Sequence, residues 1–445
     1  MATTSGERSL VKALGVWGLA AGIFNVTVGG GIFALPADPA IAGRLGTSAP
    51  LAYVVVAIAF GLIVLCFAEV GSRVSLTGGP YAYAETAFGP FVAFLTGVML
   101  WLLGFFATAA VSTVFASSAA RLFPALGSPV ARAMLLIAAY GTVAVVNIRG
   151  VQQGARLIGI VSLLKLAPLV ILAIVGFVAV KPANLVMESV PAGGDLMRAS
   201  IVLVFAFSGL ESALVPSGEV KDPSRTVPRA IFVAMGGITV LYIALQLVAQ
   251  GILGASLSGR ATPLADAAEI ALGPWGRTLL LVGVMVSTFG HLSGMTLAIP
   301  RATFAFARDG FLPDALARVH PRYHTPHIAI AVQASLTCVL AIASTFGFLA
   351  VIANVAALLV YFSCALAAWR LRSLNVQSGG TPFRVPGGPV VPVLACLVII
   401  AMLTSIRLNE WAVLVAVLAA AALVFFVTRT RRAARATSAA PQARP

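Results

Sequence analysis

Ionisable side chains are rare in the apolar stretches of this chain, and three of them stand out. Lys165 lies about two helical turns inside one such stretch. Glu211 and His291 lie inside two later stretches. An ammonium, a carboxyl group and an imidazole in apolar surroundings are costly to bury, so they indicate function by default. The chemistry they offer is proton transfer or the binding of a polar solute.

Three consecutive glycines, Gly29, Gly30 and Gly31, interrupt the first apolar stretch, which runs without a charge from Ala13 to Leu35. Each glycine costs roughly 1 kcal/mol relative to alanine inside a helix. The triplet also removes every side chain from three successive backbone positions. Two explanations remain open. One is a broken helix whose bare N–H groups face a cavity, and the other is close packing between helices.

The composition shows which elements must position these residues. The chain has 445 residues, of which 60% are hydrophobic and only 10% are charged. Soluble proteins of this size lack that balance, so the chain is predicted to be an all-α polytopic membrane protein. Its four cysteines lie in apolar stretches and show neither metal-ligand spacing nor the loop placement of disulfides. We expect no metal and no cofactor.

Apolar stretches separated by polar or Gly/Pro-rich breaks predict about twelve transmembrane helices. The first lacks a small-residue cleavage site, so it is interpreted as a helix that stays in the protein. The predicted helices cover residues 13–36, 47–70, 89–117, 130–148, 155–180, 197–218, 229–253, 275–305, 327–345, 347–369, 389–406 and 410–428.

Lysine and arginine are distributed unevenly between the two sides of these helices. With the N-terminus inside, 20 of the 29 basic residues fall on the inner side and 8 on the outer side. The positive-inside rule therefore predicts a cell-membrane protein with both ends, 1–12 and the disordered basic tail 429–445, in the cytoplasm. The net charge of +15 is explained by this topology and by contact with the lipid bilayer. No nucleic-acid partner is expected.

A second interruption lies in the sixth predicted helix. Ser208 and Gly209 break the stretch 201–216, and Glu211 follows them in mid-span. The first and sixth helices are five spans apart, so they cross the membrane in opposite directions. Paired interruptions of this kind indicate an inverted-repeat transporter with a site at the midplane. The predicted divisions are a first five-helix repeat at 13–180, a second at 197–369 and two further helices at 389–428.

Several stretches carry a family likeness. They are GGGIFALPA (29–37), GGPYAYAETAFGPF (78–91), FAFSGLESALVPSGEVKDPSRTVPRAI (205–231), FAFARDGFLP (304–313) and PFRVPGGPVVPVL (382–394). With them the chain resembles the amino acid–polyamine–organocation (APC) superfamily of amino-acid permeases over nearly its whole length. The resemblance implies a LeuT-like five-plus-five inverted repeat with discontinuous helices 1 and 6, plus two C-terminal helices. It also implies secondary transport of an amino acid.

The resemblance implies that the carboxylate and the ammonium of a bound amino acid lie at the two breaks. The helix half that begins after the glycines offers N–H groups and a positive dipole end to the carboxylate. Thr27, Phe205 and Ser208 match positions whose carbonyls hold the ammonium, and Phe205 also resembles an outer aromatic gate. The predicted substrate-binding residues are Thr27, Val28, Gly29, Gly30, Gly31, Phe205, Ala206, Ser208, Gly209 and Met295.

Two departures from the family pattern bear on the substrate. Many relatives have serine at the position of Gly30, so one hydroxyl contact is missing. Met295 stands where the arginine/agmatine antiporter has a tryptophan that stacks on guanidinium, and a thioether offers no cation–π surface. We therefore expect a neutral, small or apolar amino acid. A lipid-facing or core-packing role for Met295 is the alternative.

The resemblance also gives roles to the ionisable residues. Lys165 matches the lysine that replaces a sodium ion in proton-coupled members, and the alternative is that it extends to the membrane surface. Glu211 matches a proposed proton-sensitive glutamate, or it holds the unwound helix by hydrogen bonds. His291 is expected to be a hydrogen-bonded core residue instead of a proton relay. Charges at inner ends, among them Arg73, either close a cytoplasmic gate or are solvated.

Other functions remain as alternatives. An exchanger of amino acids cannot be separated from a proton symporter by sequence, and a cationic amino acid or polyamine transporter is a further candidate. A membrane-embedded enzyme is disfavoured because Pro321 and Pro326 separate His320, His324 and His327, and no Glu or Cys completes a site. A channel is disfavoured because no ring of repeated charges appears. Oligomeric state and partner subunits are left open.

Overall fold

The structure is a computed structural model in which the regular elements of the described residues are helices. The segments 1–12 and 429–445, together with Glu219 and Asp309 of the inner charges, lie outside the described residues. For 155–164, 297 and 409 only the backbone is described. The described residues are 14–76, 78–149, 155–187, 190–215, 217, 220–308, 310–377 and 380–428.

Eight helices in these ranges are long and apolar enough to cross a membrane, or nine if one bent pair counts as a single span. The bent pair consists of α1 (Val16–Thr27) and the helical segment Gly30–Gly43, whose axes differ by 45°. Three shorter apolar helices cover Lys165–Ala179, His327–Ala343 and Val390–Leu403. The chain is therefore an all-helical, multi-pass membrane protein, as predicted.

Most helices begin and end within a few residues of their predicted bounds. The main exception is α10, which begins at Pro223 instead of 229, because a proline is well suited to a first helical turn even when that turn is polar. The helices that correspond to the predicted spans after the first are α3 (Ala49–Arg73), α5 (Pro90–Leu122), α6 (Pro129–Ile148), α7 (Ala155–Val175), α8 (Gly193–Phe207), α10 (Pro223–Leu253), α12 (Pro274–Arg308), α13 (His327–Ala343), α14 (Phe346–Ser373), α15 (Val390–Leu403) and α16 (Leu408–Val427).

Two short helices have no counterpart among the predicted spans. They are α4 (Pro80–Phe88) and α11 (Pro263–Leu272). With nine and ten residues they cannot cross a bilayer, which needs about 20 residues in a helix. Their sequences therefore contain no apolar stretch of span length.

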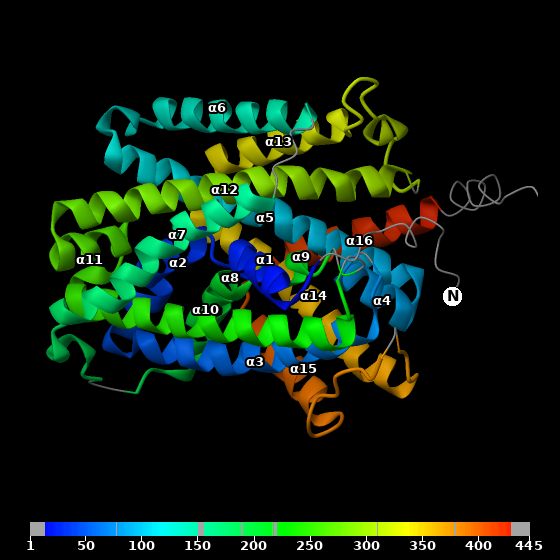
Figure 1. Cartoon of the computed structure of the whole chain (residues 1–445), viewed down its shortest axis with the longest axis horizontal. Helices are drawn as coiled ribbons and strands as arrows, with labels where there is room; N and C mark the ends of the chain where they lie inside the picture. Colours follow the sequence, from blue (N-terminus) through cyan, green and yellow to red (C-terminus); the bar gives the residue numbers. More distant parts are fainter. Residues whose placement is uncertain are drawn as a thin grey trace, which may run out of the picture.

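The interrupted helices occupy the centre of the molecule. Figure 1 shows α1 and α8 in the middle, with α12 and α5 on one side and α3 and α10 on the other. In the most apolar window of each span, 72% of the α8 region is buried inside the protein, against 22% for α6 and for α16. Protein therefore surrounds the backbone where these helices break, which is the condition for irregular backbone at membrane depth.

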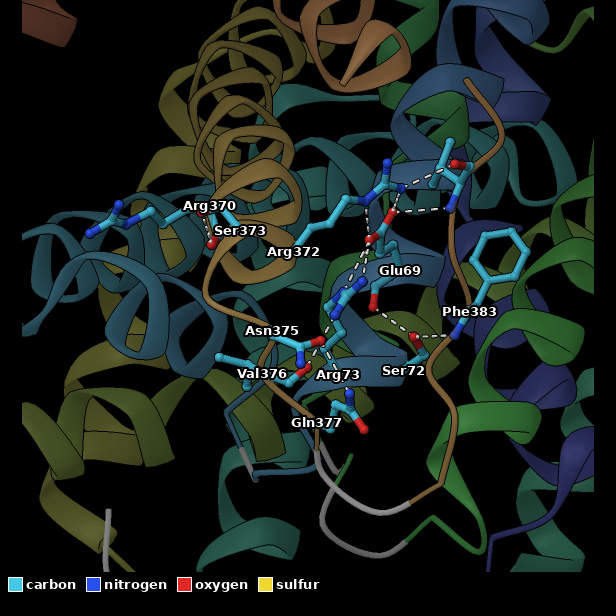
Figure 2. A network of polar contacts seen from close by, with 11 residues as sticks. Glu69, Ser72, Arg73, Arg370, Arg372, Ser373, Asn375, Val376, Gln377 and Phe383 are labelled. Carbon is cyan, nitrogen blue, oxygen red and sulfur yellow. Dashed lines mark hydrogen bonds and ion pairs between the residues drawn. The ribbon is translucent and has the colours of Figure 1, made fainter. Parts of the chain in front are cut away.

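An ion-pair network joins the ends of α3 and α14 to the loop that follows α14 (Figure 2). Glu69 is fully buried, and its Oε1 accepts hydrogen bonds from Arg73 (Nη2, 2.8 Å) and Arg372 (Nε, 2.8 Å). Its Oε2 accepts from Nη2 of Arg372 and from the N–H of Val385, the latter at 3.1 Å. Arg73 also donates to the carbonyl of Val376 at 3.1 Å. Arg73 is therefore not a solvated charge. It belongs to a buried cluster around one carboxylate.

Candidate functional site

The first break lies at Val28 and Gly29. Their backbone angles, φ −76°, ψ 82° and φ −116°, ψ −153°, leave the helical region for two residues. Helix α2 (Gly30–Ala34) then begins without a capping side chain. Among the described residues, none accepts a hydrogen bond from the N–H of Gly30 or Gly31. These N–H groups are therefore available to bind an anion.

The second break lies at Ser208 and Gly209, between α8 and α9 (Leu210–Ala213). Gly209 has φ +132°, a conformation that glycine adopts without the strain that a side chain would add. Within the described part of the chain, the carbonyls of Phe205 and Ala206 accept no hydrogen bond. The end of α8 thus presents hydrogen-bond acceptors, whereas the start of α2 presents donors.

The two breaks touch one another. A Cβ atom on Gly209 would lie 2.8 Å from Cα of Thr27, which is closer than real Cβ atoms approach backbone. A Cβ atom on Gly31 would lie 2.9 Å from the ring of Phe205. Glycine on each side therefore allows the two backbones to meet, and both explanations of the glycine triplet, an open break and close packing, apply at once.

A small cavity opens between the breaks. Its volume is about 40 Å³, which is enough for water but not for an amino acid. Anything the size of an amino acid requires wall residues to move. The walls are formed by Val26, Thr27, Gly29, Gly30, Gly31, Leu103, Gly104, Ala107, Val111, Phe205, Ser208, Gly209, Glu211, Ser212, His291 and Met295.

The structure brings most of the predicted binding residues to this cavity. Of the ten, only Val28 and Ala206 are not among the lining residues, although both are buried beside it. The wall supplied by α5 was missed. Gly104, Ala107 and Val111 recur at a spacing of three and four residues, so they share one face of that helix. That spacing of small residues was the available signal.

Lys165 points at the first break and not at the membrane surface. Its side chain is 2% exposed, and Nζ donates to the carbonyl oxygens of Asn25 (2.5 Å) and Val28 (2.8 Å). The last carbonyls of a helix carry the negative end of its dipole, which stabilises a cation placed there. Lys165 does not line the cavity. Its ammonium instead holds the end of α1 next to Gly29.

Tyr242 of α10 also holds this end. Its hydroxyl donates to the carbonyl of Thr27 at 3.1 Å, and the same carbonyl accepts the N–H of Gly29 at 2.8 Å. Two donors already occupy the carbonyl that the sequence assigned to a substrate ammonium. A substrate ammonium is therefore expected to bind the carbonyls at the end of α8 and not that of Thr27. No sequence pattern pointed to Tyr242.

Glu211 holds the second break. Its Oε2 accepts the N–H of Gly209 at 3.0 Å and lies 2.9 Å from the hydroxyl of Tyr361 in α14. That hydroxyl is also 3.1 Å from Oγ of Ser208, so its single proton serves one of the two oxygens at a time. A carboxyl group that fixes an unwound helix is expected to make such hydrogen bonds.

The inner-loop histidines form a turn. The Nδ1 atom of His320 accepts the N–H of Arg322 at 3.1 Å, and its ring lies 5.1 Å from that of His327. In the ranges that the structure describes, no group of three or more His, Cys, Asp or Glu side chains could hold a metal ion. The hydrogen bond and the ring contact of His320 are typical of side chains that stabilise a folded loop.

Two broken helices that meet at a central cavity in a multi-pass helical protein define a membrane transport protein. The chain belongs to the amino acid permease family, whose sequence profile matches residues 14–437. This match confirms the resemblance to the APC superfamily.

Three relatives, all from Bacillus subtilis (strain 168), are similar over most of their length. The methylthioribose transporter is 28% identical over 96% of this chain and 95% of its own. The branched-chain amino acid permease BcaP is 27% identical over 92% and 93%. The serine/threonine exchanger SteT is 30% identical over 87% and 90%. The residues matched by the family profile, 14–437, include both breaks and the cavity walls.

Proposed function

We propose that this protein is a secondary transporter that carries neutral, small or apolar amino acids across the cell membrane by alternating access. The observation that supports this is the contact between the two breaks. Gly30 and Gly31, whose N–H groups have no acceptor among the described residues, and Phe205, whose carbonyl has no donor there, line one cavity from two different helices. Such an arrangement matches a carboxylate and an ammonium without a charged side chain.

The cavity walls favour a neutral side chain. Met295 and the α5 residues Leu103 and Ala107 are apolar, and Glu211 is the one carboxylate among the described residues that line the cavity. Glu211 is already bonded to Gly209. A guanidinium or a polyamine would need a further carboxylate, and none lines the cavity in the described part of the chain. The relatives named for branched-chain amino acids and for serine and threonine favour the same substrate class.

A ligand screen tests this proposal. Neutral amino acids are expected to raise the melting temperature of the purified protein, because a ligand that binds only the folded state stabilises it by about 2.7 kcal/mol at 100 times its Kd. The screen includes the twenty amino acids, polyamines and methylthioribose. A shift with polyamines or arginine alone would overturn the neutral-substrate proposal, and a shift with methylthioribose alone would overturn amino-acid transport.

We also propose that Lys165 couples transport to protons. A neutral amine keeps enough N–H groups for the carbonyls of Asn25 and Val28, but it loses the positive charge that the carbonyl end of α1 stabilises. The protonation state would then bias the position of the end of α1.

Lys165→Gln and Lys165→Ala are expected to remove the response of amino-acid uptake to an imposed proton gradient in liposomes. Lys181→Gln is the matched control, since Lys181 is exposed and outside the site. Its response should equal that of the wild type. A wild-type response in either Lys165 variant would disprove the coupling role.

Exchange is the second candidate mechanism, favoured by the relative that is named as an exchanger. The same liposomes separate the two mechanisms. A symporter accumulates labelled amino acid in empty vesicles when a proton gradient is imposed, whereas an exchanger needs amino acid inside the vesicles.

The proposed topology has twelve spans, since the three shorter apolar helices add to the nine spans counted with the bent pair. We propose that 13–180 and 197–369 are inverted repeats whose broken first helices are α1–α2 and α8–α9. Both termini would lie in the cytoplasm. Protease access to tags at the two ends of the chain in inside-out vesicles tests this orientation.

A further inference from the structure

Each glycine of the triplet faces a different neighbour. A Cβ atom on Gly30 would lie 3.3 Å from Val111, and one on Gly31 would lie 2.9 Å from Phe205. A Cβ atom on Gly29 would lie 3.7 Å from Nδ1 of His291. Of these three side chains only the imidazole is polar, and it lines the cavity. The start of α2 therefore has one hydrogen-bonding side chain next to it.

The surroundings of the ring indicate which nitrogen carries the proton. Nε2 of His291 is buried and has no hydrogen-bond partner in the described structure. An unpaired buried N–H is rarer in proteins than an unpaired acceptor, so Nε2 is best left as the acceptor. In the neutral ring the proton then sits on Nδ1. Nδ1 is the nitrogen beside Gly29, so an N–H donor is available there.

A carboxylate at this position would lack one donor that many family members supply. Gly30 has no hydroxyl, and Val111 occupies the space beside it. A carboxylate has two oxygens with about four acceptor positions, and the N–H groups of Gly30 and Gly31 fill two of them. The imidazole N–H beside Gly29 is a side-chain donor that can fill a third.

We propose that His291 is a substrate-binding residue that donates a hydrogen bond from Nδ1 to the carboxylate of the bound amino acid. The inference rests on the proposed function, and it adds a side-chain contact from α12 to a site otherwise built from backbone groups. It also corrects the expectation that His291 is a satisfied core residue, because neither ring nitrogen has a hydrogen bond to a described residue.

The test measures binding of L-alanine, L-leucine and L-serine, each beside its carboxamide, which lacks the negative charge. The wild type should prefer at least one amino acid over its carboxamide. In His291→Leu the affinity for that amino acid should fall about tenfold, as expected for a lost hydrogen bond to a charged group, with little change for the carboxamide. His291→Gln keeps an N–H donor and should restore part of the preference.

Met295→Leu is the matched control, because Met295 lies one helical turn away on the same wall. It should change the affinities of acid and carboxamide by the same factor. If His291→Leu binds with the wild-type preference, or if His291→Gln loses as much as His291→Leu, the role of His291 is disproved while the proposed function stands. If the wild type binds none of the three amino acids, both fail.

Discussion

Gly209→Ala is expected to lower the rate of amino-acid uptake at least 100-fold. Alanine at φ +132° carries backbone strain of roughly 1–3 kcal/mol. Its Cβ would also lie 2.8 Å from Cα of Thr27, and forcing extra atoms into a packed site costs a further 1–3 kcal/mol or so. Since Thr27 and Gly209 both line the cavity, the two breaks must separate and the site is lost.

Uptake in liposomes, normalised to the amount of folded protein, measures this effect. Gly273→Ala is the matched control. Gly273 also has a positive φ of +80°, but its Cβ would have no neighbour within 4 Å. It therefore adds strain without a collision, and its uptake should stay within a few-fold of the wild type. Equal losses in both variants would mean that backbone strain, and not contact between the breaks, causes the effect.

Glu69→Gln is expected to cause the largest loss of stability. The carboxylate of Glu69 is the shared partner of Arg73 and Arg372, and Arg73 is 1% exposed. Removing one member of a buried ion pair costs about 3–5 kcal/mol, because the remaining charge stays buried without compensation. We expect the melting temperature of the purified protein to fall by about 3–5 °C.

Two further variants separate charge from shape in this test. Glu269→Gln removes the same charge from a pair with Arg277 that is 30–41% exposed, where less than about 1 kcal/mol is at stake. Adding Arg73→Met to Glu69→Gln removes the stranded guanidinium and should recover part of the loss. If the Glu69→Gln and Glu269→Gln proteins have the same melting temperature, the network contributes little to stability.

The sequence predicted the parts of this protein that depend on local composition. Apolar stretches located the long helices, and the glycines at 29–31 and the Ser208–Gly209 pair located both breaks. Helix α4 was missed because a helix of nine residues leaves no span-length pattern. The predicted and observed helix bounds differed most where a helix begins with a proline and a polar first turn, as at Pro223.

What could not be predicted were contacts between distant helices. Tyr242 and Tyr361 are tyrosines in apolar helices, and nothing in the sequence marks them as partners of Thr27 and Glu211. The partner of Arg73 could have been anticipated, because Glu69 lies one helical turn before it. The joining of Arg372 to the same carboxylate depends on how α3 and α14 pack.

The wall formed by α5 has a consequence for how members of this family diverge. A Cβ on Gly104 would lie 3.3 Å from Cε of Met295, and Ala107 lines the same cavity. A few point substitutions there would change the room for cargo while leaving the backbone of both helix breaks intact. Relatives of similar length that are named for a thiosugar, for branched-chain amino acids and for hydroxyl amino acids fit such a division. Substitutions on one face of α5 can then change the substrate while the two broken helices stay the same.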